Sequence, residues 1–145
     1  MKILIATDGS KFSQAAVERA CELITKPKET EIKLVSVFRA PTIATEPFMP
    51  ASDYYQKVSE SLEALAASYV KEARETIENR FPVVQLTEEV VIGTPGQTIV
   101  EIAEEWSPDI LVVGSHGRGF WSRALLGSVS DAVIYHAPCS VLVVR

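Results

Sequence analysis

Residues 110–128 read ILVVGSHGRGFWSRALLGS. The first four are a continuous apolar run, and from Gly114 onward the stretch holds four of the seven glycines of the chain. Such an apolar run is typical of a strand buried on both faces, as the strands of a parallel sheet are. Glycine loses more conformational freedom on folding than any other residue, so its concentration here requires a reason. The stretch predicts a buried parallel strand that opens into a turn built from backbone.

The rest of the chain alternates between strand and helix patterns. Short apolar runs predict strands at residues 2–6, 32–38, 83–92, 110–113 and 140–144. Apolar residues at helical spacing predict a helix in each gap: from Ser13 to about Lys26, through residues 58–77 up to Pro82, and across residues 95–106 and 127–136. The order βαβαβαβαβ predicts an α/β fold in which helices cover both faces of a parallel sheet.

Length and charge limit the class of protein. With 145 residues the chain has the size of one domain, which we expect to span residues 1–145. The net charge of −5 argues against a nucleic-acid or anionic-membrane surface, although backbone N–H groups can still bind a small anion. The apolar start is shorter than a signal-peptide core, and no run approaches a membrane span, so we expect a cytoplasmic protein. Cys21 and Cys139 are expected to be ordinary thiols.

The glycine segment lies where α/β proteins bind ligands. In a doubly wound sheet, ligands sit beyond the carboxyl ends of the strands, and the helix after this segment presents unpaired N–H groups there. Glycines let the backbone approach phosphate oxygens, and Ser128 adds a hydroxyl. The fingerprint G-x-G-x-x-G fails at Ser122, and the Lys-Ser or Lys-Thr pair of a P-loop is missing. What remains is the spacing Gly114-x2-Gly117-x9-Gly127-Ser128.

This spacing resembles the nucleotide-binding signature G-x2-G-x9-G-[ST] of the universal stress proteins. The opening ILIATDGS at residues 3–10 is similar to the first strand and acidic turn of that family. The segments GSVS at 127–130 and HAPCSVLVV at 136–144 are similar to its last helix and strand. The resemblance implies a universal stress protein domain with strand order 3-2-1-4-5, a Rossmann-like fold of the adenine nucleotide alpha-hydrolase-like type. Because the glycine signature is complete, it also implies the branch of the family that binds ATP.

The resemblance further implies a site for ATP and Mg²⁺ at the ends of the first, second and fourth strands. The implied contacts follow the parts of the nucleotide: the Val37 backbone for the adenine edge, Asp8 with Thr7 beside it for the ribose or Mg²⁺, Gly114 and Gly117 for the ribose and phosphates, Gly127, Ser128 and Arg118 for phosphate oxygens, and Val129 and Ser130 as further backbone or hydroxyl donors.

Some of these residues also have a simpler interpretation. Asp8 could serve only the turn or cap the next helix. A carboxylate about 4 Å from a phosphate is repelled by about 4 kcal/mol at an effective dielectric constant of 20, so a binding Asp8 must meet ribose hydroxyls or share a cation. Ser128 could be a helix N-cap, as Thr94 is expected to be for the helix that starts at Pro95. Arg118 could be a solvated loop charge, and we interpret His116 as a loop residue.

Three classes of function remain. The first is a regulator whose conformation or partners change with ATP occupancy under stress. The second is a slow ATPase or an adenylyl-transferring enzyme, although no His–carboxylate pair at a recognisable spacing predicts a general base. The third is a phosphoryl-accepting receiver domain, which needs an Asp at the end of the third strand, where this chain has Val91-Ile92-Gly93. We expect the first, with at most weak ATP hydrolysis.

The last strand predicts an assembly. It is apolar from Val141 to Val144, and the implied strand order puts it at the edge of the sheet, where an exposed apolar strand is normally paired or protected. The resemblance implies pairing with the same strand of a second copy, so we expect a homodimer through Val141–Val144. We also expect valine at Gly117 or Gly127 to leave the fold intact, because both positions are predicted to border the crevice.

Overall fold

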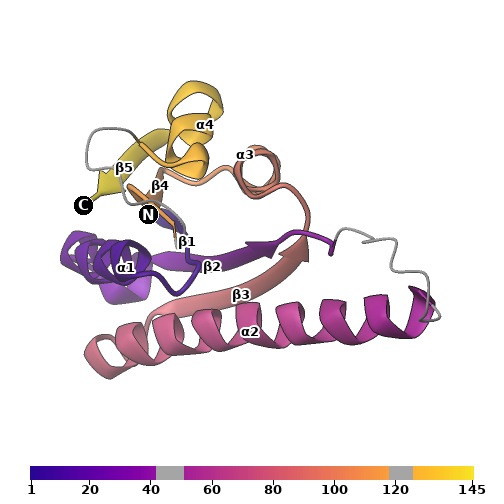
Figure 1. Ribbon diagram of the computed structural model, residues 1–145. Coiled ribbons are helices and arrows are strands. Elements are labelled where there is room, and N and C mark those ends of the chain that lie inside the picture. Colours follow the sequence, from indigo (N-terminus) through magenta and orange to yellow (C-terminus); the bar gives the residue numbers. More distant parts are fainter. Residues whose placement is uncertain (42–50, 118–125) are drawn as a thin grey trace.

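The structure is a computed structural model that describes residues 1–41, 51–117 and 126–145 (Figure 1). Five strands lie within these ranges: β1 (Lys2–Ala6), β2 (Glu31–Phe38), β3 (Gln85–Ile92), β4 (Ile110–Gly114) and β5 (Ser140–Val144). The helices are α1 (Lys11–Leu23), α2 (Ala51–Arg80), α3 (Pro95–Trp106) and α4 (Ser128–His136), with a short 3-10 turn, η1 (Pro27–Glu29). Element order and type are those that the sequence predicts.

The five strands form one parallel sheet in the order β3-β2-β1-β4-β5, which confirms the expected topology. β1 lies between β2 and β4, with Ile3 in register with both Ile32 and Ile110. Because the strands are parallel, the turn after β1 and the segment after β4 leave the sheet at the same end, the carboxyl end of the strands. The topology thereby brings Asp8 and Gly114 to one place.

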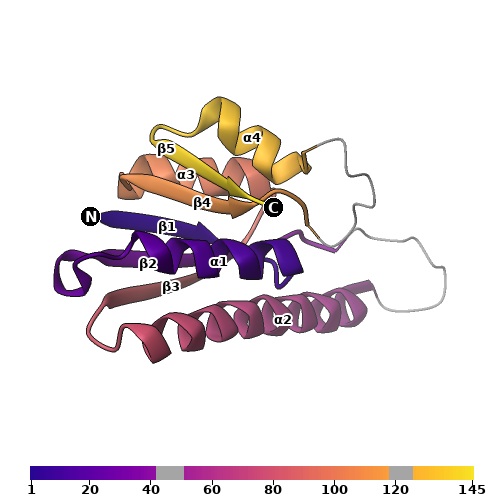
Figure 2. The same cartoon turned by 90° about the vertical axis from the view of Figure 1, so that its left-hand side faces the viewer.

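Helices cover both faces of the sheet, and the views in Figures 1 and 2 agree on the layers. Along β1 the side chains alternate: Ile3 and Ile5 pack under α1 and α2, and Leu4 packs under α3 and α4. All three are fully buried. A strand with a core on each side has no polar face, which is why β1 reads as a continuous apolar run.

Element ends differ from the prediction for local reasons. α1 begins at Lys11, two residues early, because the Ser10 side chain caps it by accepting from the Ser13 N–H at 3.2 Å. β3 begins only at Gln85, because the Val84 N–H closes a turn on the Phe81 carbonyl at 3.1 Å. Thr94 precedes α3 as predicted, but its side chain makes no capping bond, so that expectation was wrong.

The long helix α2 is anchored through its second half. Its buried stripe there consists of Ala66, Val70, Ala73 and Ile77. Arg74 pairs with Glu88 on β3, and Arg80 pairs with Glu18 on α1. The first half of the helix extends past the sheet in Figure 1. None of the helices in the described ranges combines the length and apolarity needed to cross a bilayer.

Cys21 and Cys139 are free thiols, as expected. Burial raises the pKa of both, so at neutral pH they stay protonated.

The packing of α3 on α4 depends on a glycine. An added Cβ on Gly96 would lie 2.7 Å from the Cβ of Ala132 and 3.6 Å from the Ser128 carbonyl oxygen. Real Cβ atoms do not approach that closely, so a larger residue here must push the two helices apart. Gly96 therefore fixes how closely the first turn of α3 approaches the first turn of α4.

Gly96→Ala is expected to lower the free energy of unfolding by about 1–3 kcal/mol, the usual cost of overpacking. Urea unfolding followed by circular dichroism measures the loss. Adding Ala132→Gly removes the clashing methyl and should recover part of it. Equal instability of the single and double variants would show that this contact does not limit the packing.

Candidate functional site

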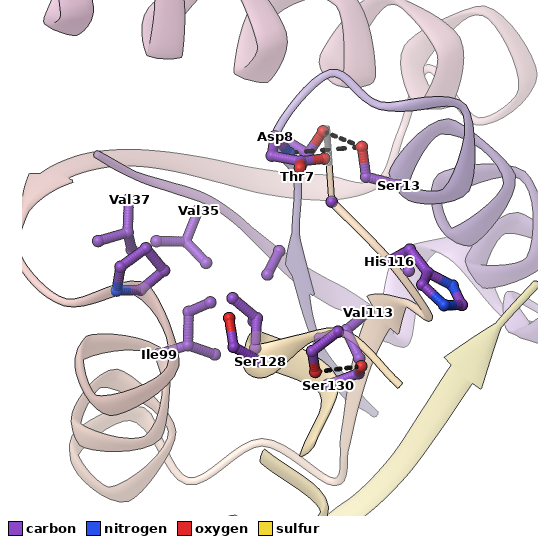
Figure 3. Close-up of a pocket in the computed structure, with 16 residues that line it drawn as sticks. Thr7, Asp8, Ser13, Val35, Val37, Ile99, Val113, His116, Ser128 and Ser130 are labelled. Carbon is purple, nitrogen blue, oxygen red and sulfur yellow. Dashed lines mark hydrogen bonds between the residues drawn. The ribbon is translucent and has the colours of Figure 1, made fainter. Parts of the chain in front are cut away.

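A pocket of about 240 Å³ lies at the carboxyl ends of β1, β2 and β4 (Figure 3). Val35, Val37, Pro95 and Ile99 form an apolar end, contributed by β2 and α3. The other end is polar, and its walls are the turn after β1, the segment after β4 and the start of α4. Nine of the ten residues assigned by resemblance line this pocket: Thr7, Asp8, Val37, Gly114, Gly117, Gly127, Ser128, Val129 and Ser130. The tenth, Arg118, lies outside the described residues.

The turn after β1 holds the Asp8 carboxylate. One oxygen, Oδ1, accepts from the Ser10 N–H at 3.0 Å, so Asp8 does serve its own turn. It does not cap α1, because Ser10 does. The other oxygen, Oδ2, lies 2.9 Å from where a Cβ on Gly117 would be, which places it against the segment after β4. The turn therefore uses one carboxylate oxygen, and the other faces the segment after β4.

Gly9 is required inside this turn. Its φ of 71° lies in the left-handed region that glycine adopts at little cost. An added Cβ would also lie 2.3 Å from the ring of Tyr69 on α2. The turn is therefore closed tightly beneath α2, and the Thr7 hydroxyl points inward to bond Ser13 Oγ at 3.2 Å.

The start of α4 supplies backbone donors. Gly127 is the N-cap and Ser128 is the first helical residue, so the interpretation of Ser128 as the N-cap was wrong. The N–H groups of Ser128, Val129 and Ser130 belong to the first turn, where a helix offers no internal acceptor. The first bond of the ladder runs from the Asp131 N–H to the Gly127 carbonyl at 2.9 Å. Figure 3 shows Ser128 and Ser130 across the pocket from Thr7 and Asp8.

Ser130 was expected as a backbone or hydroxyl donor, and its hydroxyl is engaged within the fold. Its hydroxyl is buried and donates to the carbonyls of Gly127 at 2.9 Å and Ser115 at 3.0 Å. A hydroxyl has one proton, and these two carbonyls share it. What Ser130 keeps for a ligand is its backbone N–H.

Each signature glycine has its own packing reason. A Cβ on Gly114 would lie 2.7 Å from the carbonyl carbon of Phe12 and 2.8 Å from the Ser13 nitrogen, so the first turn of α1 rests on the end of β4. A Cβ on Gly127 would lie 3.2 Å from both His116 Cα and the Ser115 carbonyl oxygen. At Gly117 it would meet the Asp8 carboxylate instead, at 2.9 Å from Oδ2. Gly114 and Gly127 therefore serve backbone packing as well as the pocket.

The Val37 backbone borders the pocket because β1 is shorter than β2. The Val35 carbonyl accepts from the Thr7 N–H at 2.9 Å, which directs the main-chain groups of Val35 toward β1. Main-chain groups alternate sides along a strand, so those of Val37 point the same way, past the end of β1 at Ala6. The Phe38 carbonyl, one residue on, accepts from the Gly93 N–H on the β3 side, as this alternation requires.

His116 is a packed residue of the pocket wall. Its Nδ1 is 3.0 Å from Ser115 Oγ, and its ring lies 5.1 Å from that of Phe12. This agrees with its interpretation as a loop residue. Among the described residues no three His, Cys, Asp or Glu side chains come together as a metal site.

Seven further residues line the pocket that were not assigned to it from the sequence: Ala6, Ser13, Val35, Pro95, Ile99, Val113 and His116. Of these, Ile99 is a buried residue of α3. The available signal was topological: α3 follows β3, so its first turn must lie at the same edge as the ends of β1 and β4.

These features define a class: a doubly wound α/β protein whose ligand pocket lies between strand ends and a helix N-terminus. The model of the universal stress protein family matches residues 1–145. The chain belongs to that family.

Relatives cover nearly the whole chain. Universal stress protein MJ0531 of Methanocaldococcus jannaschii is 33% identical over an alignment of 146 residues that covers 99% of this chain and 81% of that protein. Hypothetical protein MJ0577, whose structure served to assign its biochemical function, superposes with a TM-score of 0.83 at 28% identity, covering 99% of this chain and 94% of the other. A universal stress protein in complex with cAMP shares the fold at a TM-score of 0.63 and 24% identity, covering 100% of this chain and 96% of the other. A universal stress protein family member from Arabidopsis thaliana with AMP bound shares the fold at a TM-score of 0.63 and 22% identity, covering 99% of this chain and 90% of the other.

The three glycines are predicted to differ in how much a larger residue lowers the free energy of unfolding. Gly114→Ala is expected to lower the free energy of unfolding by about 1–3 kcal/mol, because the obstacle is the backbone of α1. Gly117→Ala should change it by less than about 0.5 kcal/mol, because only a carboxylate must move. Valine at Gly127 should also destabilise, contrary to the sequence expectation. Denaturant titration of the three variants measures this, and equal losses at 114 and 117 would contradict it.

Proposed function

We propose that this protein binds ATP with Mg²⁺ in the pocket and acts in the cytoplasm as a nucleotide-dependent regulator of a stress response. The observation that carries the proposal is the pairing of opposite chemistries in one pocket. An apolar end under the Val37 backbone lies next to a polar end built from the first turn of α4 and the Asp8 carboxylate.

The apolar end suits an adenine ring. Val35, Pro95 and Ile99 offer apolar surface to a flat ring. The main chain of Val37, directed past the end of β1, would meet the edge of the base with an N–H and a carbonyl. A nucleobase carries both donors and acceptors on its edge, so this pairing suits it better than a purely apolar ligand.

The polar end suits phosphates. Three backbone N–H groups at the start of α4 and the positive end of its dipole attract an anion. Ser128 is exposed at the first helical position and would add its hydroxyl. Gly117 is exposed beside the pocket and would let phosphate oxygens approach the main chain. We also assign Arg118 to binding the phosphates. The nucleotide-bound relatives support a nucleotide in this fold.

Asp8 fits a magnesium ion that arrives with the nucleotide. Mg²⁺ is usually held by one or two carboxylates together with substrate phosphates. The Oδ2 oxygen lies against the segment that would hold the phosphates, and a shared cation removes the repulsion between two anions there. When bound, the ion would neutralise phosphate charge.

We propose a regulatory function in preference to that of a slow ATPase or an adenylyl-transferring enzyme. His116, the histidine that lines the pocket, is bonded to Ser115 and packed on Phe12. This arrangement suits a wall residue better than a general base.

We also propose a homodimer through Val141–Val144. β5 is an edge strand that pairs with β4 along one side, and these four residues are half-buried. A twofold axis would let the same edge of a second copy cover the other side.

Calorimetry on ligand-stripped protein tests the nucleotide proposal. Gly117→Val should weaken ATP binding because the valine side chain would occupy the space proposed for the phosphates. The loss should be at least 10- to 150-fold, the change in affinity that corresponds to one charge-assisted hydrogen bond. Adenosine is the control ligand, and its affinity should fall much less than that of ATP because it lacks phosphates. Equal ATP affinity of the variant and the wild type would mean that this segment does not bind phosphate.

Asp8→Ala separates two roles of the carboxylate. If Asp8 shares Mg²⁺ with the phosphates, the variant should lose affinity for ATP in Mg²⁺ and much less in a chelator. Equal losses in both would assign Asp8 to the ribose instead. The same titration in wild type reports whether Mg²⁺ contributes at all.

Sedimentation equilibrium at micromolar concentration tests the assembly. The proposal predicts the mass of two chains, that is, twice 15.9 kDa. A monomer at that concentration would contradict the dimer and leave the pocket proposal standing.

A further inference from the structure

We propose that Ser13 is a positioning residue of the nucleotide site, which holds the Asp8 carboxylate in place through its buried hydroxyl. This inference rests on the proposed function, since it concerns how the same pocket is organised. Ser13 is 3% exposed and is the third residue of α1, one turn beyond the cap at Ser10.

The Ser13 hydroxyl is the centre of a hydrogen-bond network. It donates to the Ser10 carbonyl at 3.0 Å. It lies within accepting distance of the Thr7 hydroxyl at 3.2 Å and of the Asp8 N–H at 3.4 Å. The hydroxyl has one proton and two lone pairs, so these three bonds use its whole capacity. Figure 3 shows the side chains of Thr7, Asp8 and Ser13 together at one side of the pocket.

One assignment of the protons satisfies every donor in the turn. With Ser13 Oγ occupied by Thr7 and Asp8, the Ser10 hydroxyl donates instead to the His116 carbonyl at 3.4 Å. The Gly9 N–H reaches Thr7 Oγ1 at 3.4 Å. The Ser10 N–H reaches Asp8 Oδ1 at 3.0 Å. The last bond orients the carboxylate, and the others fix the backbone from which it projects.

Loss of the hydroxyl would loosen this turn at its centre. In Ser13→Ala the Asp8 N–H and the Thr7 hydroxyl lose their shared acceptor, and a buried unsatisfied donor is costly. To regain these bonds from water the turn must open, and Thr7, Asp8 and Ser13 all line the pocket. Asp8 would then no longer hold Oδ2 against Gly117, where the phosphates and the metal ion are proposed to lie.

Comparison with Ser130 shows which bonds of Ser13 are common to a serine at the third position of a helix and which are particular to this turn. It occupies the same position in α4 and also bonds the N-cap carbonyl, at 2.9 Å. Its second partner, however, is the Ser115 carbonyl, so it anchors the loop after β4. Ser13 is joined to the turn that carries the carboxylate, and this predicts an effect through Asp8.

The experiment is a double-mutant cycle on ATP affinity in Mg²⁺. Ser13→Ala should weaken binding by about 2- to 12-fold, the range for one hydrogen bond. Added to Asp8→Ala it should cause no further loss, because the hydroxyl acts through that side chain. Ser13→Thr keeps the hydroxyl and should restore binding. Additive losses in the double variant would overturn the proposal.

Thr30→Val is the matched control. Thr30 is also buried, and its hydroxyl donates to the Lys26 carbonyl at 2.9 Å, at the opposite end of the sheet. The Thr30→Val variant loses a buried hydrogen bond that does not involve the turn after β1, so its affinity for ATP should stay within about twofold of wild type. A comparable loss in Thr30→Val would reduce the role of Ser13 to general stability and overturn the proposal.

Amide hydrogen exchange in the ligand-free protein separates this proposal from the proposed function. Ser13→Ala should accelerate exchange of the Asp8 and Ser10 amides by about tenfold relative to Thr30→Val, because their acceptors are lost or released. Unchanged exchange would overturn the positioning role whatever the protein binds. Faster exchange in a protein that binds no nucleotide would uphold the link between Ser13 and Asp8 and refute the nucleotide proposal instead.

Discussion

The contact between Gly114 and the first turn of α1 is the constraint on which the pocket depends. The main chain of α1 approaches so closely that a Cβ on Gly114 would lie 2.7 Å from it. This contact brings the end of β4 against the helix that starts after β1. Ser10 can then reach the His116 carbonyl, and Asp8 lies beside Gly117. Three segments that are distant in sequence thus share one polar wall, and a wider spacing at this point would separate the carboxylate from the loop that faces it.

Much of the fold follows from the sequence because the sheet is buried on both sides. Ile3, Leu4 and Ile5 alternate between two cores, so their strand carries no polar residue and is easy to recognise. Apolar residues at helical spacing predicted the helices, and Pro82 and Pro95 marked two of their ends. The strand order came from the resemblance, since spacing alone does not say which strands are neighbours. Ends were less predictable: β3 starts two residues late because a turn bond at Val84 competes with the sheet.

The site was predictable in outline and less so in its roles. The spacing of the glycines marks the segment, but it does not distinguish Gly114, which packs on a helix, from Gly117, which borders the pocket. For Ser130 the sequence left a backbone or a hydroxyl donor open, and the structure shows that the hydroxyl binds two carbonyls. Ser13 was missed entirely. The deciding contacts depend on the folded path of the chain: α1 lies against Gly114, the Ser115 carbonyl accepts from the Ser130 hydroxyl, and the turn after β1 closes around the Ser13 hydroxyl. The spacing of residues in the sequence does not show these contacts.

The apolar and polar ends of the pocket are formed by different structural elements, so each end can determine selectivity for a different part of a ligand. The apolar end exists because β1 ends at Ala6 while β2 continues to Phe38, so it is set by strand lengths inside the rigid sheet. The polar end is set by turns and a helix start, which are held by hydroxyl networks around Ser13 and Ser130. In the proposed nucleotide complex, changes in the turns would therefore alter the response to phosphates and metal while recognition of the base stays the same. A pocket built in this way would keep one nucleobase and vary the number of phosphates to which it responds.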